Sequence, residues 1–356
     1  MEELLKTIIE LPKSGATDFH VNSDENAYIR KFGKIAPLPG KIFTDEEIKK
    51  FILATSTPKA REILGKTKQV NYSFQSETGE RLRIAAYFSR GKFSISVRNI
   101  RLKAPKMEDL DLPEGLRKAL SKQSGLIIVG SPSGQGKTTT ISAIIDFLNT
   151  HFERNIITIE NPVEILFKDD KSSIIQRSIP LDVPNFWEGL KDSYRLDPDV
   201  VVTDSLNYPD AFDQALFLCE SGCLVIGAMD GGNCPQILER ILFSRSADER
   251  VGLRSKLTTH LSLIISQKLV EKSDVGGMTA VYDILVNTLQ VKALIRNENF
   301  VMLKSIQEQD HSSGMQTFDR HILSLVKKKT ISMETAISVA EDAQEMSARF
   351  SKKGGN

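Results

Sequence analysis

The amino-acid sequence predicts an α/β protein with a small α+β domain first, a second domain built on a mostly parallel sheet, and a helical segment last. Three observations support this fold class. The first hundred residues contain runs in which polar and apolar side chains alternate, as they do in antiparallel strands. From residue 125 on, short continuous apolar runs alternate with amphipathic stretches, as in parallel strands covered by helices. A glycine-rich loop that ends in Gly-Lys-Thr follows the first of those apolar runs.

The expected N-terminal domain spans residues 1–100. Its first helix is expected over residues 2–11, and strands follow that are joined by a turn at Phe32-Gly33. A second helix should follow Thr44, because Thr44 and Glu47 have the spacing of a capping box. Three further alternating runs predict an antiparallel meander: residues 70–75, 81–88 and 93–100.

A linker is expected at residues 101–114, where prolines and charges replace periodic apolar residues. The second domain is expected over residues 115–272, with strands at GLIIVG, NIITIE, DVVVTD, GCLVIGAM and LSLIISQ. Its covering helices are expected at Thr138–Asn149, Asn185–Tyr194, Pro209–Glu220 and Cys234–Phe243. From residue 273 to residue 356 we expect helix, with disorder only in the terminal SKKGGN.

Composition and charge exclude several classes of protein. The 356 residues are 40% hydrophobic and 26% charged, which is typical of a globular chain with a full core. The charges of the 47 basic and 46 acidic residues nearly cancel. We therefore expect no nucleic-acid partner, since binding to the phosphate backbone of a nucleic acid needs a large excess of basic residues. We expect neither a signal peptide nor a membrane span, because the first residues are acidic and the apolar runs are short. The three cysteines are expected to be free thiols that bind no zinc.

The strongest functional signal is the segment GSPSGQGKTT, which begins at Gly130 between an expected strand and an expected helix. A phosphate-binding loop needs glycines, so that backbone N–H groups can approach the phosphates, and a helix N-terminus whose dipole attracts them. Lys137 should reach the β- and γ-phosphates of ATP, and Thr138 should bind Mg²⁺. The residues expected to contact ATP are Ser133, Gly134, Gln135, Gly136, Lys137, Thr138 and Thr139. The segment departs from the usual pattern at Ser131, which takes the position of the first glycine.

A nucleotide site of this kind also needs an acidic residue at the end of a neighbouring strand. Asp204 follows the apolar run 200–202 and is expected to act at the metal. Hydrolysis further needs a group that orients or deprotonates the attacking water, usually a carboxylate beside that acid. The next residue is Ser205, which cannot act as such a base. The residues alone therefore predict nucleotide binding more firmly than hydrolysis.

Taken in order along the chain, these features resemble the secretion-ATPase superfamily, and specifically the type IV pilus retraction ATPases of twitching motility. The resemblance covers nearly the full chain. Besides the phosphate loop, it rests on the segments Thr17–His20, Ile159–Glu164, Arg195–Asp199, Ser266–Leu269 and Gly314–Asp319. It implies a PAS-like N-terminal domain and a RecA-like P-loop ATPase domain. It also implies a hexameric ring, either a homo-hexamer or a mixed ring with a related motor, on the cytoplasmic side of the inner membrane. There, ATP-driven movement would act with a membrane platform protein to pull pilin subunits back into the membrane.

The resemblance also assigns roles to individual residues. It implies that Glu160 and Glu164 of the acidic box are catalytic together with Asp204, and that Glu160 lies nearest the γ-phosphate and the attacking water. It further implies that arginines of the N-terminal domain reach the nucleotide of a neighbouring subunit, where they would neutralise charge on the phosphoryl oxygens. The arginines at the matching positions are Arg81, Arg83 and Arg98.

The chain departs from the family at residues that belong to the chemistry. Ser205 stands where the family has its catalytic glutamate, and Asn207 stands where an arginine commonly follows it. Cys223 and Asp230 take the places of two histidines, and Asn161 replaces the usual aspartate of the acidic box. Carboxylates can replace histidines as hydrogen-bond acceptors but not as cationic donors.

Three functions remain open on the sequence. The first is an ATP-binding hexameric motor for pilus retraction, with hydrolysis intact or reduced. The second is a catalytically silent ring subunit that scaffolds or regulates an active motor. The third, a type II secretion or pilus assembly ATPase, ranks lower because such relatives usually insert a four-cysteine zinc element that three scattered cysteines cannot build.

Overall fold

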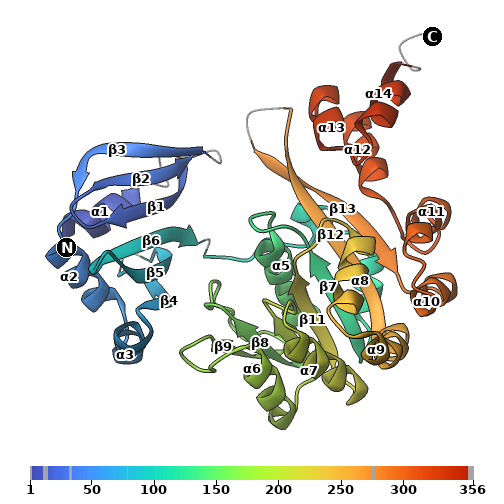
Figure 1. The fold of residues 1–356 in the computed structure, drawn as a ribbon, viewed down its shortest axis with the longest axis horizontal. Coiled ribbons are helices and arrows are strands. Elements are labelled where there is room, and N and C mark those ends of the chain that lie inside the picture. The colour runs from blue at the N-terminus through green and yellow to red at the C-terminus, as the bar shows by residue number, and fades with distance from the viewer. Residues whose placement is uncertain are drawn as a thin grey trace. The chain divides into compact units, whose positions relative to one another are not determined.

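The computed structural model describes residues 2–10, 15–31, 34–77, 79–100, 102–273 and 277–351. The turn expected at Phe32-Gly33 and the last five residues lie outside these ranges. The chain divides into two compact units, which Figure 1 shows in ribbon form. The first unit comprises Met1–Ala104, Thr158–Lys168 and Gln176–Gly189, and the second comprises Pro105–Ile157, Asp169–Ile175 and Leu190–Asn356. The domain limits given above stay a prediction.

The first unit contains a six-stranded antiparallel sheet in the order β3-β2-β1-β6-β5-β4. The strands are β1 (Ala16–Asn22), β2 (Asn26–Lys31), β3 (Lys34–Ile42), β4 (Gln69–Gln75), β5 (Arg81–Ser89) and β6 (Lys92–Ile100). The helices are α1 (Glu2–Glu10), α2 (Asp45–Thr55) and α3 (Pro58–Thr67). They pack with the sheet around a core that includes Phe51, Tyr72 and Ile84. The expected capping box is confirmed, because Thr44 Oγ1 accepts from Glu47 N and the Glu47 carboxylate accepts from Thr44 N.

Two later segments of the chain belong to this first unit. Leu181 packs against the core of the sheet, and Lys59 Nζ donates a hydrogen bond to its carbonyl oxygen. Ser73 Oγ on β4 donates to the carbonyl oxygen of Val163 at 2.6 Å. The acidic box therefore lies beside strands β4 and β5.

The second unit is built on a sheet in the order β13-β12-β7-β11-β10-β8-β9. Its strands are β7 (Gly125–Gly130), β8 (Asn155–Glu160), β9 (Ser173–Ser178), β10 (Val200–Thr203), β11 (Leu224–Met229), β12 (Leu261–Glu271) and β13 (Met278–Val286), of which β8 and β9 also contribute residues to the first unit. The pairs β12–β7, β7–β11 and β11–β10 are parallel, and β12–β13 is antiparallel. The central strands are almost fully buried, which explains their continuous apolar sequences.

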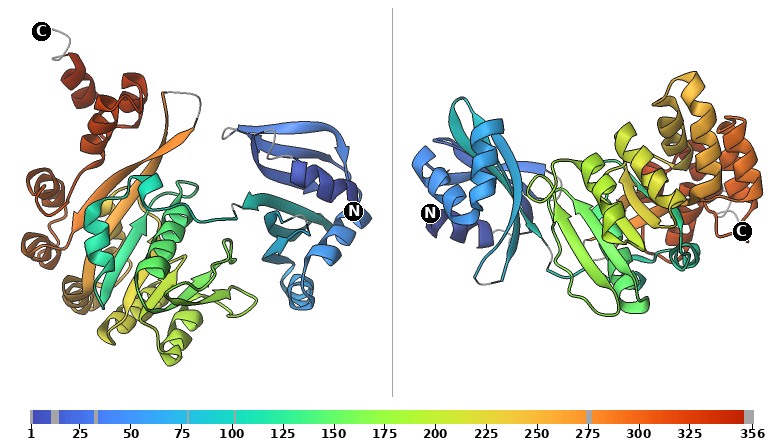
Figure 2. Two further views of the ribbon diagram at one scale, coloured as in Figure 1. Left: turned by 180° about the vertical axis from the view of Figure 1, so that it is seen from behind. Right: turned by 90° about the horizontal axis from the view of Figure 1, so that it is seen from below.

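Helices cover both faces of this sheet. The chain moves in opposite directions across the sheet through α5 (Lys137–His151) and α7 (Pro209–Glu220), so right-handed crossovers place these two helices on opposite faces. The remaining helices of this part are α4 (Glu114–Leu120), α6 (Phe186–Ser193), α8 (Cys234–Phe243) and α9 (Ala247–His260). The final helices, α10 (Leu289–Arg296), α11 (Val301–Gln309), α12 (Phe318–Lys327), α13 (Met333–Val339) and α14 (Ala343–Ser351), gather beyond the edge strand β13 (Figures 1 and 2).

The expected fold class is confirmed, but two strands were missed. We expected helix from residue 273 on, whereas Met278–Val286 form β13 and the helices begin at Leu289. Residues of β13 pair with β12 from Leu263 to Glu271, so a long-range partner decides the conformation of an apolar run that periodicity alone leaves ambiguous. The short strand β9 was also missed, because Ser173–Ser178 is only partly apolar.

Candidate functional site: a phosphate loop with an unusual set of neighbours

The phosphate loop lies between β7 and α5. Strand β7 ends at Gly130, and α5 begins at Lys137 with Gly136 as its N-cap residue. Gly134 and Gly136 have φ angles of 78° and 87°, in the left-handed region that favours glycine. Since Gly136 has no side chain that could cap α5, the N–H groups of the first helical turn remain available to an anion. The loop therefore has the geometry that phosphate binding requires.

Side-chain amides fix this loop to strand β12. Gln267 is 1% exposed; its Nε2 donates to the carbonyl oxygen of Gln135 at 2.6 Å, and its Oε1 accepts from Thr140 Oγ1 at 2.7 Å. The side chain of Gln135 accepts from the backbone N–H of Leu269 at 2.6 Å. We expected Gln135 to contact nucleotide, and the structure gives its side chain this contact with β12. Sequence reasoning assigned Gln267 no role in the loop, although a glutamine within a buried apolar run was a signal that could have been followed.

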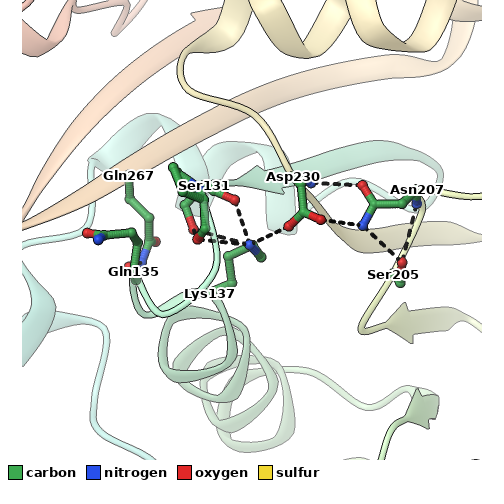
Figure 3. Close-up of polar contacts among 8 residues, drawn as sticks. Ser131, Gln135, Lys137, Ser205, Asn207, Asp230 and Gln267 are labelled. Atoms are coloured by element: carbon green, nitrogen blue, oxygen red, sulfur yellow. Dashed lines mark hydrogen bonds and ion pairs between the residues drawn. The ribbon is translucent and has the colours of Figure 1, made fainter. Parts of the chain in front are cut away.

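The ammonium group of Lys137 is held from both sides (Figure 3). Its Nζ donates to the carbonyl oxygens of Ser131 at 2.6 Å and Pro132 at 3.2 Å, and it lies 3.3 Å from Ser131 Oγ. Opposite the loop, Asp230 Oδ1 forms an ion pair with Nζ at 2.9 Å. Ser131, where the usual pattern has glycine, therefore adds a hydroxyl group beside the lysine.

Asp230 belongs to a hydrogen-bonded set that contains three of the substituted family positions. Asn207 Nδ2 donates to Asp230 Oδ2 at 3.0 Å, and Asp230 N donates to Asn207 Oδ1 at 2.9 Å. Asn207 Nδ2 also lies 3.2 Å from Ser205 Oγ, which accepts from Asn207 N at 3.3 Å. Figure 3 shows this set extending from Ser205 to Lys137. We call it the Ser205–Asn207–Asp230 network.

The other residues of this unit that we expected at the nucleotide or its metal lie in the loop, in the first turn of α5 and directly after β10. Ser133 is exposed at the loop, and Thr138 and Thr139 are half-buried in the first turn of α5. Asp204 is half-buried and directly follows β10, which ends at Thr203. A hydroxyl group and a carboxylate are oxygen ligands of the kind that Mg²⁺ prefers.

The two glutamates of the acidic box lie in the first unit. Glu160 is 7% exposed, and its Oε1 accepts from Thr158 Oγ1 at 2.5 Å and from Gln176 Nε2 at 3.0 Å. Burial raises the pKa of Glu160, and the hydrogen bonds from Thr158 and Gln176 act against that shift. Glu164 Oε1 pairs with Arg83 NH1 at 2.8 Å.

The three expected arginines lie on one face of β5 and β6. Arg81 and Arg83 are two residues apart on β5, and Arg83 lies directly opposite Arg98 on β6. Arg81 donates to the carbonyl oxygens of Val163 and Glu164, while Arg98 pairs with the Asp18 carboxylate at 2.7 Å. Carboxylates offset the repulsion between the two opposed guanidinium groups, because Arg83 pairs with Glu164 and Arg98 pairs with Asp18.

The structure thus groups the expected site residues into two sets. The second unit holds the phosphate loop and Asp204, and the first holds Glu160, Glu164 and the arginines. Cys223, at one of the two histidine positions, is a buried free thiol whose pKa burial raises. Within the described ranges, no three or more His, Cys, Asp or Glu side chains gather as a metal site, and none of the helices combines the length and apolar character that a membrane crossing needs.

Comparison with known proteins places this site in a family. A family model described as Type II/IV secretion system protein matches residues 2–338. The type IV pilus ATPase PilU of Pseudomonas aeruginosa is 28% identical over 345 residues, which cover 97% of this chain and 90% of that protein. A twitching motility protein of Neisseria gonorrhoeae is 31% identical, with 85% of this chain and 81% of that protein covered. The crystal structure of the pilus retraction motor PilT with bound ADP is similar with a TM-score of 0.83, at 29% identity and with 96% and 97% of the two chains covered.

The chain therefore belongs to the Type II/IV secretion system protein family, in its branch of type IV pilus retraction ATPases. The resemblance inferred from the sequence is confirmed. The sequence signatures that carried it, above all the phosphate loop and the acidic box, lie within the matched residues.

Proposed function

We propose that this chain is an ATP-binding motor subunit of a type IV pilus machine and that it acts in pilus retraction. The observation that carries this proposal is the phosphate loop, in which Gly134 and Gly136 have positive φ angles and Lys137 opens α5. The similar retraction motor was solved with ADP, which supports a nucleotide as the ligand of this loop. ATP provides the β- and γ-phosphates that a lysine at this position binds.

Mg²⁺ is the proposed metal. The hydroxyl of Thr138 and the carboxylate of Asp204 would hold it. When bound, it would neutralise negative charge on the phosphates of ATP. The fit rests on donor chemistry, because a hydroxyl group at the start of α5 and a carboxylate after β10 are hard oxygen ligands. The remaining residues expected at the nucleotide, Ser133, Gln135 and Thr139, would contribute backbone N–H groups of the loop and the first helical turn.

Glu160 and Glu164 are the proposed catalytic carboxylates besides Asp204. Glu160 is the candidate for the group that takes a proton from the attacking water, since a carboxyl whose pKa is raised by burial is better matched to that task. Glu164 is tied to Arg83, so it connects the acidic box to the arginines. We expect Glu160→Gln to abolish any turnover that the native chain shows.

Assembly into a ring would give the arginines of β5 and β6 a role at the nucleotide. We propose a hexamer, either of this chain alone or mixed with a related motor, in which Arg81, Arg83 and Arg98 reach the nucleotide of the adjacent subunit. Three guanidinium groups on one sheet face supply charged donors for phosphate oxygens, in exchange for the carboxylates that pair with Arg83 and Arg98 in the isolated chain. The ring would act at the cytoplasmic side of the inner membrane on a membrane platform protein, with no nucleic acid involved.

The Ser205–Asn207–Asp230 network favours a second candidate function, a ring subunit that binds nucleotide but does not hydrolyse it efficiently. Ser205 offers no carboxylate, and Asn207 offers no positive charge. Such a subunit would scaffold or regulate an active motor, with nucleotide as a structural ligand.

Nucleotide binding is tested with Lys137→Ala. We expect Mg-ATP affinity to fall by about 10- to 100-fold, since a charged hydrogen bond contributes about 1.5–3 kcal/mol. Lys118→Ala is the control, because Lys118 is exposed on α4 and away from the loop sequence. If Lys137→Ala bound nucleotide as tightly as the native chain, the motor assignment would be wrong.

Phosphate release separates the two candidates. We expect Ser205→Glu alone to leave turnover low, because its carboxylate would be placed in a buried position beside Asp230. A chain that combines Ser205→Glu, Asn207→Arg and Asp230→His restores all three family residues and should turn over ATP faster. Turnover by the native ring would favour the motor, whereas no turnover by the native ring, with turnover in the triple variant, would favour the silent subunit.

A further inference from the structure

Asp230 is positioned by the fold, not by a chance surface contact. In the sheet, β11 lies beside β7 in parallel, and Met229 is in register with Gly130. The residues that follow these two strands, Asp230 and Ser131, are therefore neighbours at the carboxyl ends of the strands. Two hydrogen bonds to Asn207 then fix both the backbone and the carboxylate of Asp230.

Within the part of the chain that the structure describes, Asp230 also supplies the full negative charge among the hydrogen-bond partners of Lys137. The other acceptors are the carbonyl oxygens of Ser131 and Pro132 and the Ser131 hydroxyl, which are neutral. The ion pair at 2.9 Å is partly shielded from water, since the side chain of Lys137 is 16% exposed and that of Asp230 is 43% exposed. Such a pair is stronger than an ion pair between fully exposed groups.

We propose that Asp230 is a positioning residue that competes with nucleotide phosphate for Lys137 and thereby sets the affinity of the site. This inference rests on the proposed function. A bound phosphate chain must either displace the carboxylate from Nζ or lie close to its negative charge, and both lower affinity. The repulsion grows with ligand charge, so ATP is disfavoured more than ADP.

Asp230→Asn tests this proposal with little change in shape. Asparagine keeps an oxygen that can accept from Asn207 Nδ2 and keeps the backbone N–H that donates to Asn207, but it removes the negative charge. We expect Asp230→Asn to bind ATP about tenfold more tightly than the native chain, which corresponds to about 1.4 kcal/mol. The gain should be smaller for ADP, and it should be present both with Mg²⁺ and in EDTA.

The matched control is Asp213→Asn. Asp213 forms an ion pair with Arg245, also at 2.9 Å, with exposed fractions of 56% and 12%. This change removes the same charge from the chain and breaks a similar pair, so it should leave nucleotide affinity unchanged. Asp230→Glu keeps the negative charge, so its nucleotide affinity should stay near the native value. If Asp230 acted only through its shape, Asp230→Glu would disturb binding more than Asp230→Asn.

Affinities are measured by titration calorimetry on the purified full chain, with ATP and ADP as probes and with folding checked by circular dichroism. Unchanged or weaker ATP binding by folded Asp230→Asn, while the native chain binds, would overturn the proposal and leave the proposed function intact. Weaker binding only in the presence of Mg²⁺ would also overturn it and would make Asp230 a metal-side residue. Failure of both chains to bind nucleotide would overturn the proposed function and this inference with it. If Asp230→Asn does not fold, Asp230→Ala is measured in its place with the same expected direction.

Discussion

A substitution at Gln267 measures how much the hydrogen bonds between the phosphate loop and β12 contribute to stability and to ATP binding. In Gln267→Met, a side chain of similar length replaces the amide, so packing is largely kept while two hydrogen bonds are lost. Each bond contributes about 1 kcal/mol, and the hydroxyl of Thr140, which is 2% exposed, loses its acceptor at a further cost of about 1–3 kcal/mol. We therefore expect the free energy of unfolding to fall by about 3–5 kcal/mol in urea titrations. Because the carbonyl of Gln135 is also released, the loop should bind Mg-ATP about tenfold more weakly even where the variant is fully folded.

A buried glutamine elsewhere in the same unit provides the control. Gln307 is also 1% exposed, and its Nε2 donates to Asp283 Oδ1 at 2.7 Å and to the carbonyl oxygen of Ile284 at 3.0 Å. Gln307→Met should lower stability by a similar amount and leave the ATP affinity of the folded chain unchanged. Two results would refute this reasoning. One is that Gln267→Met binds Mg-ATP as tightly as the native chain, and the other is that Gln267→Met and Gln307→Met lose ATP affinity to the same extent.

Two further predictions concern contacts that Tyr282 of β13 makes, one with His321 of α12 and one with Leu110. Burial lowers the pKa of His321 to about 4, so the neutral ring stabilises the fold above the unfolded pKa of 6.5, and this contribution is lost as the pH falls through about 4. His321→Asn keeps an acceptor for Tyr282 N but does not titrate in this range. As the pH falls from 6.5 to 4, urea titrations should show its stability rising relative to that of the native chain by up to about 3 kcal/mol. A difference in stability that does not change with pH would contradict this. Tyr282→Phe removes a hydroxyl that donates to the carbonyl oxygen of Leu110 at 2.7 Å, so calorimetric unfolding should show a loss of about 1–2 kcal/mol, and no loss would mean that this bond is not maintained in solution.

Local chemistry made much of the fold and the loop predictable. The Thr44 capping box and the alternating strands of the first sheet depend on neighbours in sequence, and the structure confirms them. The phosphate loop was recognisable for the same reason, since Gly136 and Lys137 are fixed by the local turn from β7 into α5.

Long-range pairing limited the prediction. The residues of β13 become a strand through their pairing with β12, and this cannot be read from their own apolar run. The contact between Lys137 and Asp230 joins residues 93 positions apart and follows from the adjacency of β7 and β11. The tether from Gln267 to the loop spans 132 positions. A sequence shows each of these groups, but only the order of strands shows that they meet.

The substituted residues are best understood as one coordinated replacement. The resemblance implies a glutamate, an arginine and a histidine where this chain has Ser205, Asn207 and Asp230. In this chain the three replacements satisfy one another through hydrogen bonds, and their combined charge becomes that of one carboxylate placed against Lys137. The positive φ angles of Gly134 and Gly136 are thus retained, while the net charge of the three neighbouring positions is more negative than in the family. Restoring Ser205 alone would therefore leave the carboxylate of Asp230 in place, and the charge of Asp230 is the variable by which we propose that this network sets nucleotide affinity.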